Sequence, residues 1–247
     1  MDEDTTEEHV ELAHGSKSPL NRLILYFFLA MAITWLFWIP TLMIAAENSY
    51  FVPHIGSLYL ISQEGFKDNL HVWIYVFNQL GVYGPFLSAL ITTALFEGKE
   101  GLKDLFSRVG KWRVNPKWYA AIIAIPLIIS LGTLGLAGLF GANLEHAFNP
   151  GIAVSFFFLI FLENTLTSGM EEPGWRGYAL PKLNEQHPAY KSSIILGIIW
   201  AIWHYPFVFY LYFIQMNSGL FFFFFSMAGF TAIMTFGSVI YLWLYLN

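Results

Sequence analysis

Residues 151–183 read GIAVSFFFLIFLENTLTSGMEEPGWRGYALPKL, a stretch that sets two adjacent glutamates and an arginine directly behind a strongly apolar run. The charged residues are Glu171, Glu172 and Arg176. Ionisable side chains inside a bilayer are costly, and by default they mark a site that protein or water lines. If the apolar run crosses a membrane, these three residues therefore mark a site.

The composition of the whole chain indicates a membrane protein. Of 247 residues, 56% are hydrophobic, 19% aromatic and only 12% charged, which is far from the balance of a soluble domain. Apolar runs long enough to cross the roughly 30 Å hydrocarbon layer as helices occupy residues 23–46, 71–96, 117–141, 152–170, 192–214 and 219–246. Runs of this length without alternating polarity favour helices over a barrel. The sequence predicts an all-α, polytopic transmembrane helix bundle of about six spans.

The sequence divides into two regions. Residues 1–22 are predicted to form an acidic, disordered tail, and residues 23–247 the transmembrane helical domain. The first apolar run exceeds the length of a signal-peptide core and has no small-residue cleavage pattern, so we expect it to be retained. The chain has no cysteine, which excludes disulfides, thiolate metal ligands and thiol nucleophiles.

The distribution of Lys and Arg predicts the orientation. Lys17 and Arg22 precede the first span, and the loop 97–117 carries a further six cationic residues, whereas the loop after the first span has only Lys67. The positive-inside rule places the N-terminus, this basic loop and the segment 178–191 in the cytoplasm. We expect an integral protein of a prokaryotic plasma membrane with its site open to the cytoplasm.

The spacing of the polar residues places Glu171 and His204 at one depth. If the fourth helix ends near Leu183, Glu171 lies twelve residues, or roughly 18 Å, from its cytoplasmic end. His204 lies thirteen residues after Lys191, where the next span begins. An antiparallel hairpin with its turn at residues 184–190 would therefore bring the glutamates face to face with His204.

The charged residues of the fourth predicted helix are expected to have different roles. Glu172 and Arg176 are four residues apart and suit an ion pair, which serves equally well as a fold-stabilising clamp or as part of a site. Glu171 lies about 100° around the helix, is left unpaired and is the better general base. Pro173, with Gly169 and Gly174 beside it, predicts a kink at the carboxylates.

Other polar and small residues favour scaffold roles. A lone histidine such as His204 is as often a packing residue as a functional one, and only its place opposite the glutamates favours function. Glu163 and Asn164 are interpreted as packing residues. Gly132, Gly135, Gly138 and Gly141 predict that the third helix approaches another helix closely.

The motifs EEPGWRG (171–177) and WAIWH (200–204) resemble the first two motifs of the CPBP intramembrane proteases. This family includes type II CAAX prenyl endopeptidases, bacteriocin-processing and immunity proteins, and abortive-infection proteins. The similarity extends upstream through residues 84–106 and 111–126 and is strongest over about 80–206. The double-glutamate motif is fairly specific, whereas an aromatic residue four positions before a histidine is a weak signal alone.

The resemblance implies an intramembrane endopeptidase that hydrolyses peptide bonds with an activated water. It makes Glu171 the base, gives Glu172 and Arg176 the shaping of the motif, and makes His204 an electrophile or a metal ligand. If zinc or another divalent metal is used, Glu171 and His204 would be ligands; zinc prefers three protein ligands and an open position, and the chain has no HExxH. The expected partners are the lipid bilayer and a peptide or protein substrate, membrane-associated or lipidated, and no nucleic acid.

One departure from the family keeps an alternative open. Family members carry a third motif, a histidine followed four residues later by Asn or Asp, and no histidine follows His204 here. We expect that the natural chain continues; the other interpretation is an inactive member, acting as a non-catalytic membrane binding or immunity protein. Of the other histidines, His54, His71, His146 and His187 are expected in loops or at span ends. A small ion or proton transporter is disfavoured because the halves of the chain show no inverted repeat.

Overall fold

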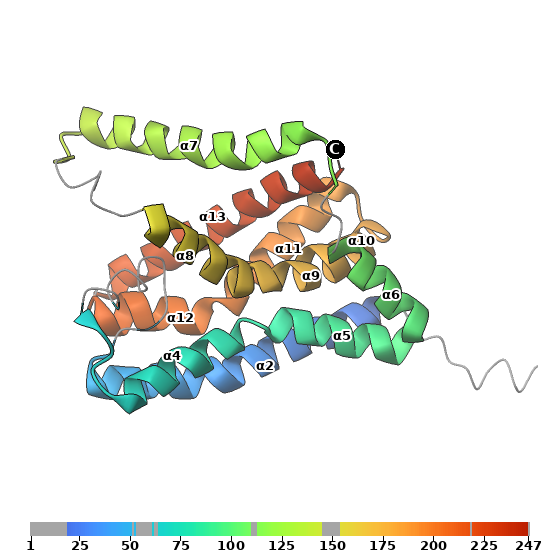
Figure 1. Ribbon diagram of the computed structural model, residues 1–247, viewed down its shortest axis with the longest axis horizontal. Helices are drawn as coiled ribbons and strands as arrows, with labels where there is room; N and C mark the ends of the chain where they lie inside the picture. The colour runs from blue at the N-terminus through green and yellow to red at the C-terminus, as the bar shows by residue number, and fades with distance from the viewer. Residues whose placement is uncertain are drawn as a thin grey trace, which may run out of the picture.

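The computed structural model describes residues 19–50, 52, 61, 64–109, 113–144, 154–217 and 219–246, and within these ranges the chain is helical without strands. Most of the predicted acidic tail, together with His54 and His146, lies outside the described residues. The long helices are α2 (Pro19–Asn48), α7 (Pro116–Leu139) and α13 (Leu220–Leu246). They lie side by side with shorter helices to form a bundle (Figure 1). The all-α prediction is confirmed.

Two further candidate spans are bent. Helices α4 (Asn69–Gly81) and α5 (Gly84–Phe96) meet at 42°, and α11 (Ala189–Trp203) meets the segment Tyr205–Gln215 at 53°. That segment consists of α12 (Tyr205–Phe209) and a π-helical turn, Tyr210–Gln215. By length and composition, the described residues therefore contain three helices able to cross a membrane, or up to five if each bent pair counts as one span.

The fourth predicted span, residues 152–170, is not among the candidate spans of the described residues. The helix α8 (Val154–Leu166) ends before the glutamates, and a 3-10 turn (Ser168–Glu171) and the short helix α9 (Glu172–Gly174) follow. A π-helical turn (Trp175–Ala179) and α10 (Leu180–Asn184) complete the segment. Pro173 lacks an N–H group and glycines flank it, so regular α-helix is not maintained there. The predicted interruption at the carboxylates is confirmed, and it breaks the segment into pieces too short to span a membrane singly.

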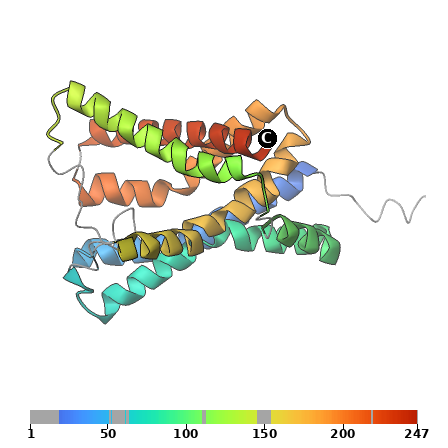
Figure 2. The same ribbon diagram turned by 45° about the horizontal axis from the view of Figure 1, so that its top comes forward.

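The first helix provides the scaffold for the core. Its buried residues recur every three or four positions and form one face, which packs on α4 and α5: Leu23, Tyr26, Ala30, Thr34, Trp38, Leu42 and Ala45. Residues on its other face, such as Phe28 and Leu36, are exposed and suit contact with lipid. Figure 2 shows α2 running alongside the segment α8 to α10, which partly hides it in this view.

Buried hydrogen bonds fasten three helices together. The Thr34 hydroxyl donates to the carbonyl of Gly81 at 2.7 Å and accepts from the Trp203 indole at 2.8 Å, which joins α2, α4 and α11. The Trp38 indole donates to the carbonyl of Asn78 at 2.8 Å. Such bonds are a common way to associate helices in lipid, where apolar burial between helices provides little drive.

Helix α7 lies on the outside of the bundle, beside α13 (Figures 1 and 2). It has no buried residue, and a Cβ added at Gly132, Gly135 or Gly141 would meet no atom within 4 Å. At Gly138 the nearest atom belongs to Leu144, at 3.2 Å in the adjoining segment. The prediction that these glycines bring the helix close to another one is therefore wrong for the described residues.

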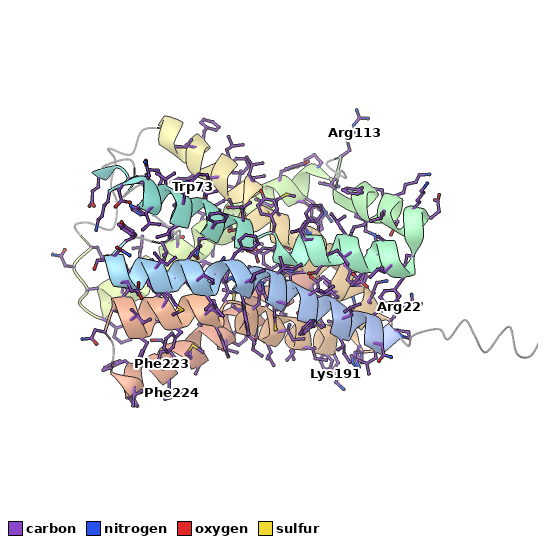
Figure 3. All side chains as sticks on the ribbon, turned by 90° about the horizontal axis from the view of Figure 1, so that it is seen from below. Arg22, Trp73, Arg113, Lys191, Phe223 and Phe224 are labelled. Carbon is purple, nitrogen blue, oxygen red and sulfur yellow. The ribbon has the colours of Figure 1, made fainter. Side chains whose placement is uncertain are left out.

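Cationic residues gather at one end of the bundle. Arg22, Arg113 and Lys191 lie toward the same end in Figure 3, opposite Trp73, Phe223 and Phe224. A polar cleft of about 50 Å³ opens at this end between α5, α6 (Gly98–Val109) and α10, where Lys182 pairs with Glu97 and Arg108 pairs with Asp104. The clustering agrees with the positive-inside prediction, and the orientation itself stays a prediction.

Candidate active site

Glu171 is held in place through one of its two carboxylate oxygens. The side chain is only 5% exposed, and its Oε2 accepts hydrogen bonds from the indole of Trp200 at 2.9 Å and from that of Trp175 at 3.3 Å. Within the described part of the chain, Oε1 accepts no hydrogen bond. One oxygen is thus positioned by two donors, and the other has its lone pairs available for a proton.

Glu172 and Arg176 form the predicted ion pair. Arg176 Nη1 lies 3.1 Å from Glu172 Oε1, one helical turn away. The guanidinium lies 4.2 Å from the ring centroid of Trp200 and 4.4 Å from that of Tyr241, and only 8% of the residue is exposed. Two aromatic faces and one carboxylate together offset the cost of a buried cation. The contact fits both a fold-stabilising clamp and a part of the site.

His204 lies at the bend between α11 and α12. Pro206 follows two residues later, and the break leaves His204 capping the end of α11. Its Nδ1 lies 2.8 Å from the carbonyl oxygen of Trp200. A carbonyl only accepts, so Nδ1 carries the proton and Nε2 of the neutral ring keeps a lone pair. A neutral His204 in this position is therefore an acceptor through Nε2, and it becomes a donor there only as imidazolium.

Trp200 connects the two halves of the site. Its indole N–H binds Glu171, its carbonyl binds His204, and its ring stacks on the Arg176 guanidinium. Three of the four residues singled out from the sequence therefore contact one tryptophan, and the fourth, Glu172, is connected to it through Arg176. In the sequence, Trp200 is recognisable only as the aromatic position of a motif, because its contacts with Glu171, His204 and Arg176 depend on tertiary structure.

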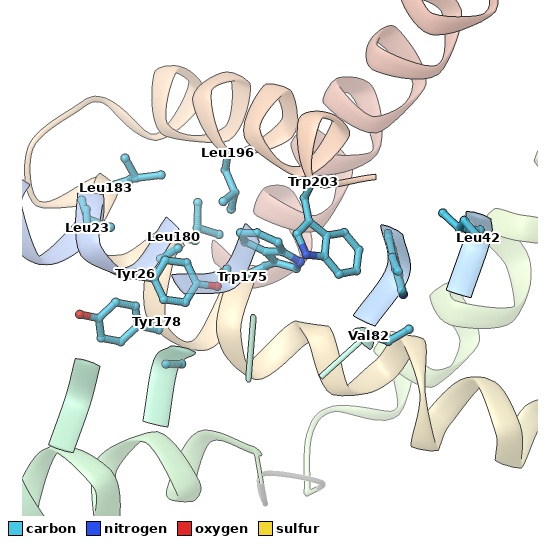
Figure 4. Close-up of a cluster of buried hydrophobic side chains, with 14 of the residues drawn as sticks. Leu23, Tyr26, Leu42, Val82, Trp175, Tyr178, Leu180, Leu183, Leu196 and Trp203 are labelled. Carbon is cyan, nitrogen blue, oxygen red and sulfur yellow. The ribbon is translucent and has the colours of Figure 1, made fainter. Parts of the chain in front are cut away.

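Three aromatic residues beside the site were not predicted from the sequence. Trp175 lies four residues after Glu171, and this spacing could have indicated the contact. Tyr241, on α13, and Tyr26, on α2, are distant in sequence and have no local signal. Figure 4 shows Tyr26 and Trp175 in the buried cluster beneath α11. Their rings meet edge to face at 5.8 Å between centroids.

The described residues do not form a metal site of the usual kind. Among them, no three His, Asp or Glu side chains lie close enough together to hold one metal ion, whereas zinc sites generally use three protein ligands or more. Glu171 accepts its two hydrogen bonds from indole N–H groups, and His204 Nδ1 donates to a carbonyl. None of these hydrogen bonds involves a metal. The expected metal ligation by Glu171 and His204 stays an untested prediction.

The remaining polar residues lie elsewhere. Glu163 accepts hydrogen bonds from Gln79 and, at 3.4 Å, from Tyr75, and Asn164 donates to the carbonyl of Ile160 at 2.9 Å. These contacts fit the packing interpretation of both residues. His71 is fully buried in the first turn of α4, and His187 lies in the turn before α11, as expected for residues at span ends.

Comparisons with known proteins confirm the predicted resemblance. Residues 150–247 match the sequence model of the family described as type II CAAX prenyl endopeptidase Rce1-like. The chain is also similar to CAAX prenyl protease 2 of Methanococcus maripaludis, with 26% identity over 189 residues. That alignment covers 75% of this chain and 62% of the length of the archaeal relative. Both Glu171 and His204 lie within the matched residues 150–247.

Proposed function

We propose that this protein is an intramembrane endopeptidase of the CAAX-protease type, in which Glu171 activates a water molecule for peptide-bond hydrolysis. The observation that carries the proposal is the arrangement of Glu171: Oε2 is anchored by two indoles, and Oε1 is open. A general base needs a fixed position and a free lone pair within reach of the proton it removes. Glu171 meets both requirements.

The reaction follows from these two oxygens. Oε1 of Glu171 removes one proton from a water molecule as the water oxygen bonds to the peptide carbonyl carbon, and the carbonyl π electrons move to the carbonyl oxygen. The electrons return as the carbon–nitrogen bond breaks, and the proton held by Glu171 passes to the leaving amine. The products are a carboxylic acid and an amine, and Glu171 is restored.

His204 has a second role in this scheme. With its Nδ1 proton donated to the carbonyl of Trp200, Nε2 of the neutral ring accepts a hydrogen bond from the second proton of the water. This orients the water between two acceptors and holds its lone pair toward the substrate. The role differs from the electrophile that the family resemblance implies, because a neutral ring in this tautomer has no proton on Nε2.

The proposed substrate is a peptide segment of a membrane-associated protein. The archaeal relative is named a prenyl protease, so a lipidated chain is the substrate class to test first. A lipid anchor would hold the peptide at the bilayer surface, beside the end where the cationic residues gather (Figure 3). We place that end, and access to the site, on the cytoplasmic side.

The test is hydrolysis of prenylated and unprenylated peptides by the purified protein in nanodiscs, comparing the wild type with Glu171→Gln and Glu163→Gln. Glu163 is the matched control, since it is also a glutamate flanked by apolar helix but hydrogen-bonds to α4 and not within the site. We expect Glu171→Gln to lose activity by a factor on the order of 10³ or more, and Glu163→Gln to retain it. Equal activity in all three proteins would contradict the proposal.

The second candidate function, a non-catalytic binding or immunity protein, predicts a different outcome. The protein would then bind a membrane partner without cleaving it, and Glu171→Gln would leave that binding intact. Cleavage that depends on Glu171 excludes this alternative, whereas absence of cleavage from every peptide favours it.

A further inference from the structure

Helix α6 connects two candidate membrane spans. It begins two residues after α5 ends at Phe96, and α7, which is itself a candidate span, begins at Pro116. Gly98 has a positive φ of 63°, a backbone conformation that lets the chain turn sharply between α5 and α6. Figure 1 shows α6 at the end of the bundle where α5 ends and α7 begins. The helix therefore lies at the level where the hydrocarbon layer ends.

The sequence of α6, GKEGLKDLFSRV, suits the membrane surface and not the hydrocarbon interior. Leu105 is buried against the bundle, whereas the charged residues are exposed: Lys99, Glu100, Lys103, Asp104 and Arg108. A helix with one apolar side and cations on its polar side is typical of the boundary between lipid and water. Which side of α6 meets the lipid depends on how its charges are paired.

One flank of α6 has its charges balanced within the protein. Arg108 forms an ion pair with Asp104 at 2.6 Å, and its Nη1 also donates to the carbonyl of Gly177 at 3.1 Å. Arg108 and Asp104 both line the polar cleft between α5, α6 and α10. This flank is directed toward the bundle, and its cation already has a carboxylate and a carbonyl as partners.

The other flank carries cations without such partners. Lys99, Lys103 and Phe106 are four and three residues apart along the helix, so their side chains share one face, called here the lysine face. All three residues are exposed, Phe106 to 51%. Within the described ranges, neither lysine forms an ion pair. The ring of Phe106 meets that of Phe86 on α5 edge to face at 6.4 Å between centroids, so α5 supports it from one side.

We propose that the lysine face binds the headgroups of anionic phospholipids at the membrane surface. The two ammonium groups complement the negative charge of the headgroups, and Phe106 enters the boundary between headgroups and acyl chains. A free phosphate ion would also complement the lysines, but it would give the exposed aromatic ring no apolar partner. Neither the lysines nor Phe106 take part in the hydrolysis steps above, so this inference does not depend on the proposed function.

The first test locates the lysine face relative to the lipid. Because the chain has no cysteine, Phe106→Cys and Ser107→Cys can each be labelled with a bimane fluorophore in nanodiscs that contain phosphatidylglycerol. Ser107 is the matched control, since it is also exposed but shares its side of α6 with Glu100, which anionic lipid repels.

We expect lipids with a nitroxide near the headgroup to quench the fluorophore at position 106 about threefold more strongly than the one at 107. Iodide in the water should show the reverse order. Equal quenching by the lipid nitroxide at the two positions, or stronger quenching at 107, would overturn the proposal.

The second test measures the charge dependence of lipid binding. The unfolding temperature of the purified protein in neutral detergent is followed as phosphatidylglycerol, phosphatidylcholine or inorganic phosphate is added, and its concentration dependence gives an apparent affinity. The wild type is compared with Lys99→Gln, Lys103→Gln and the control Lys191→Gln. Lys191 is also exposed and lies at the same end of the bundle (Figure 3), so the control removes the same charge from outside the lysine face.

We expect Lys99→Gln and Lys103→Gln each to weaken phosphatidylglycerol binding by about fivefold, and Lys191→Gln to leave it unchanged. Phosphatidylcholine and inorganic phosphate should stabilise the wild type less than phosphatidylglycerol does. An equal loss of affinity in all three variants would overturn the proposal, because the cationic end as a whole would then hold the lipid. Stabilisation by inorganic phosphate equal to that by phosphatidylglycerol would also overturn it, because a free anion would then occupy the lysine face.

Discussion

At the scale of single residues, the site depends on Trp200. The same residue donates to Glu171, accepts from His204 and stacks on Arg176. Its indole therefore fixes the position of the proposed base, and its backbone selects the tautomer of the histidine. A change in this side chain should affect catalysis more than stability.

We expect Trp200→Phe to lower kcat/KM by roughly 10- to 100-fold, because Oε2 of Glu171 loses its shorter hydrogen bond and the base is less well positioned. Trp35→Phe is the control, since it also removes an indole donor, here to the carbonyl of Trp203 at 2.9 Å. Kinetic measurements and thermal unfolding of both variants distinguish a loss of catalysis from a loss of stability. An equal loss of activity in the two would show that Trp200 acts only through packing.

The residue-level predictions from sequence succeeded where the geometry is local. The Glu172–Arg176 pair follows from helical spacing, and it forms even though the helix around it is irregular. The aromatic partner Tyr241 comes from another helix, and no pattern within the chain connects it to Arg176. Such contacts depend on how bent helices cross, which the spacing of residues along one helix does not determine.

At the scale of elements, the approach of α9 to α5 needs a glycine. A Cβ at Gly174 would lie 2.5 Å from the backbone carbonyl atoms of Pro85, which cannot move aside as a side chain could. The segment that carries Glu171 and Glu172 is thereby pressed against the start of α5. The position of the carboxylates depends on this contact.

We expect Gly174→Ala to destabilise the protein by about 1–3 kcal/mol through overpacking and to reduce activity with it. Gly169→Ala is the matched control, because its Cβ would lie 3.4 Å from the carbonyl of Asn164, at ordinary contact distance. Thermal unfolding in nanodiscs measures both. If Gly169→Ala proved as destabilising as Gly174→Ala, the close packing against Pro85 would not be the cause.

A second element-scale prediction concerns the cap of α4. Asp68 accepts from the backbone N–H of His71 at 2.8 Å and from the hydroxyl of Tyr50, and the Tyr50 bond is the main cause that lowers the pKa of Asp68. A lowered carboxyl pKa contributes stability above the unfolded value, and this stability is lost as the pH falls through the folded value.

We therefore expect Tyr50→Phe to lower the unfolding temperature at neutral pH. The difference from the wild type should begin to shrink as the pH falls below about 4 and should disappear only once the pH is below the lowered pKa of Asp68 in the folded protein. Thermal unfolding as a function of pH measures this difference. A difference that stayed constant down to acid pH would contradict the assignment to the Asp68 carboxylate.

At the scale of the whole molecule, the composition predicted the class of fold correctly. The number of membrane spans was harder to predict, because local breaks interrupt several of the helices. The apolar runs are helical over their described residues, but Pro173 and its neighbouring glycines divide the fourth predicted helix into short pieces. The bends at 82–83 and at His204 also divide two predicted spans. Hydropathy reports where apolar chain lies, and it does not report where the helix breaks.

The orientation can be tested with single cysteines, since the chain has none of its own. We choose two exposed positions for the substitutions Gln186→Cys and Glu64→Cys. Gln186 lies in the turn before α11, and Glu64 lies near the start of α4. In intact cells we expect a membrane-impermeant thiol reagent to label Glu64→Cys and not Gln186→Cys. Labelling of both after lysis is the control, and the reverse pattern in intact cells would invert the proposed topology.

The central claim, that Glu171 activates water, is tested most directly by a single turnover in water enriched in oxygen-18, with mass spectrometry of the product and of the protein. If a water activated by Glu171 attacks the peptide carbonyl, the new carboxylate contains one oxygen-18 atom in the first turnover and Glu171 remains unlabelled. If Glu171 itself attacks and water then opens the resulting anhydride at the Glu171 carbonyl, the first product carries an ordinary oxygen from the side chain, and oxygen-18 is found in Glu171. We expect the first result, and the second would contradict the assignment of Glu171 as a general base.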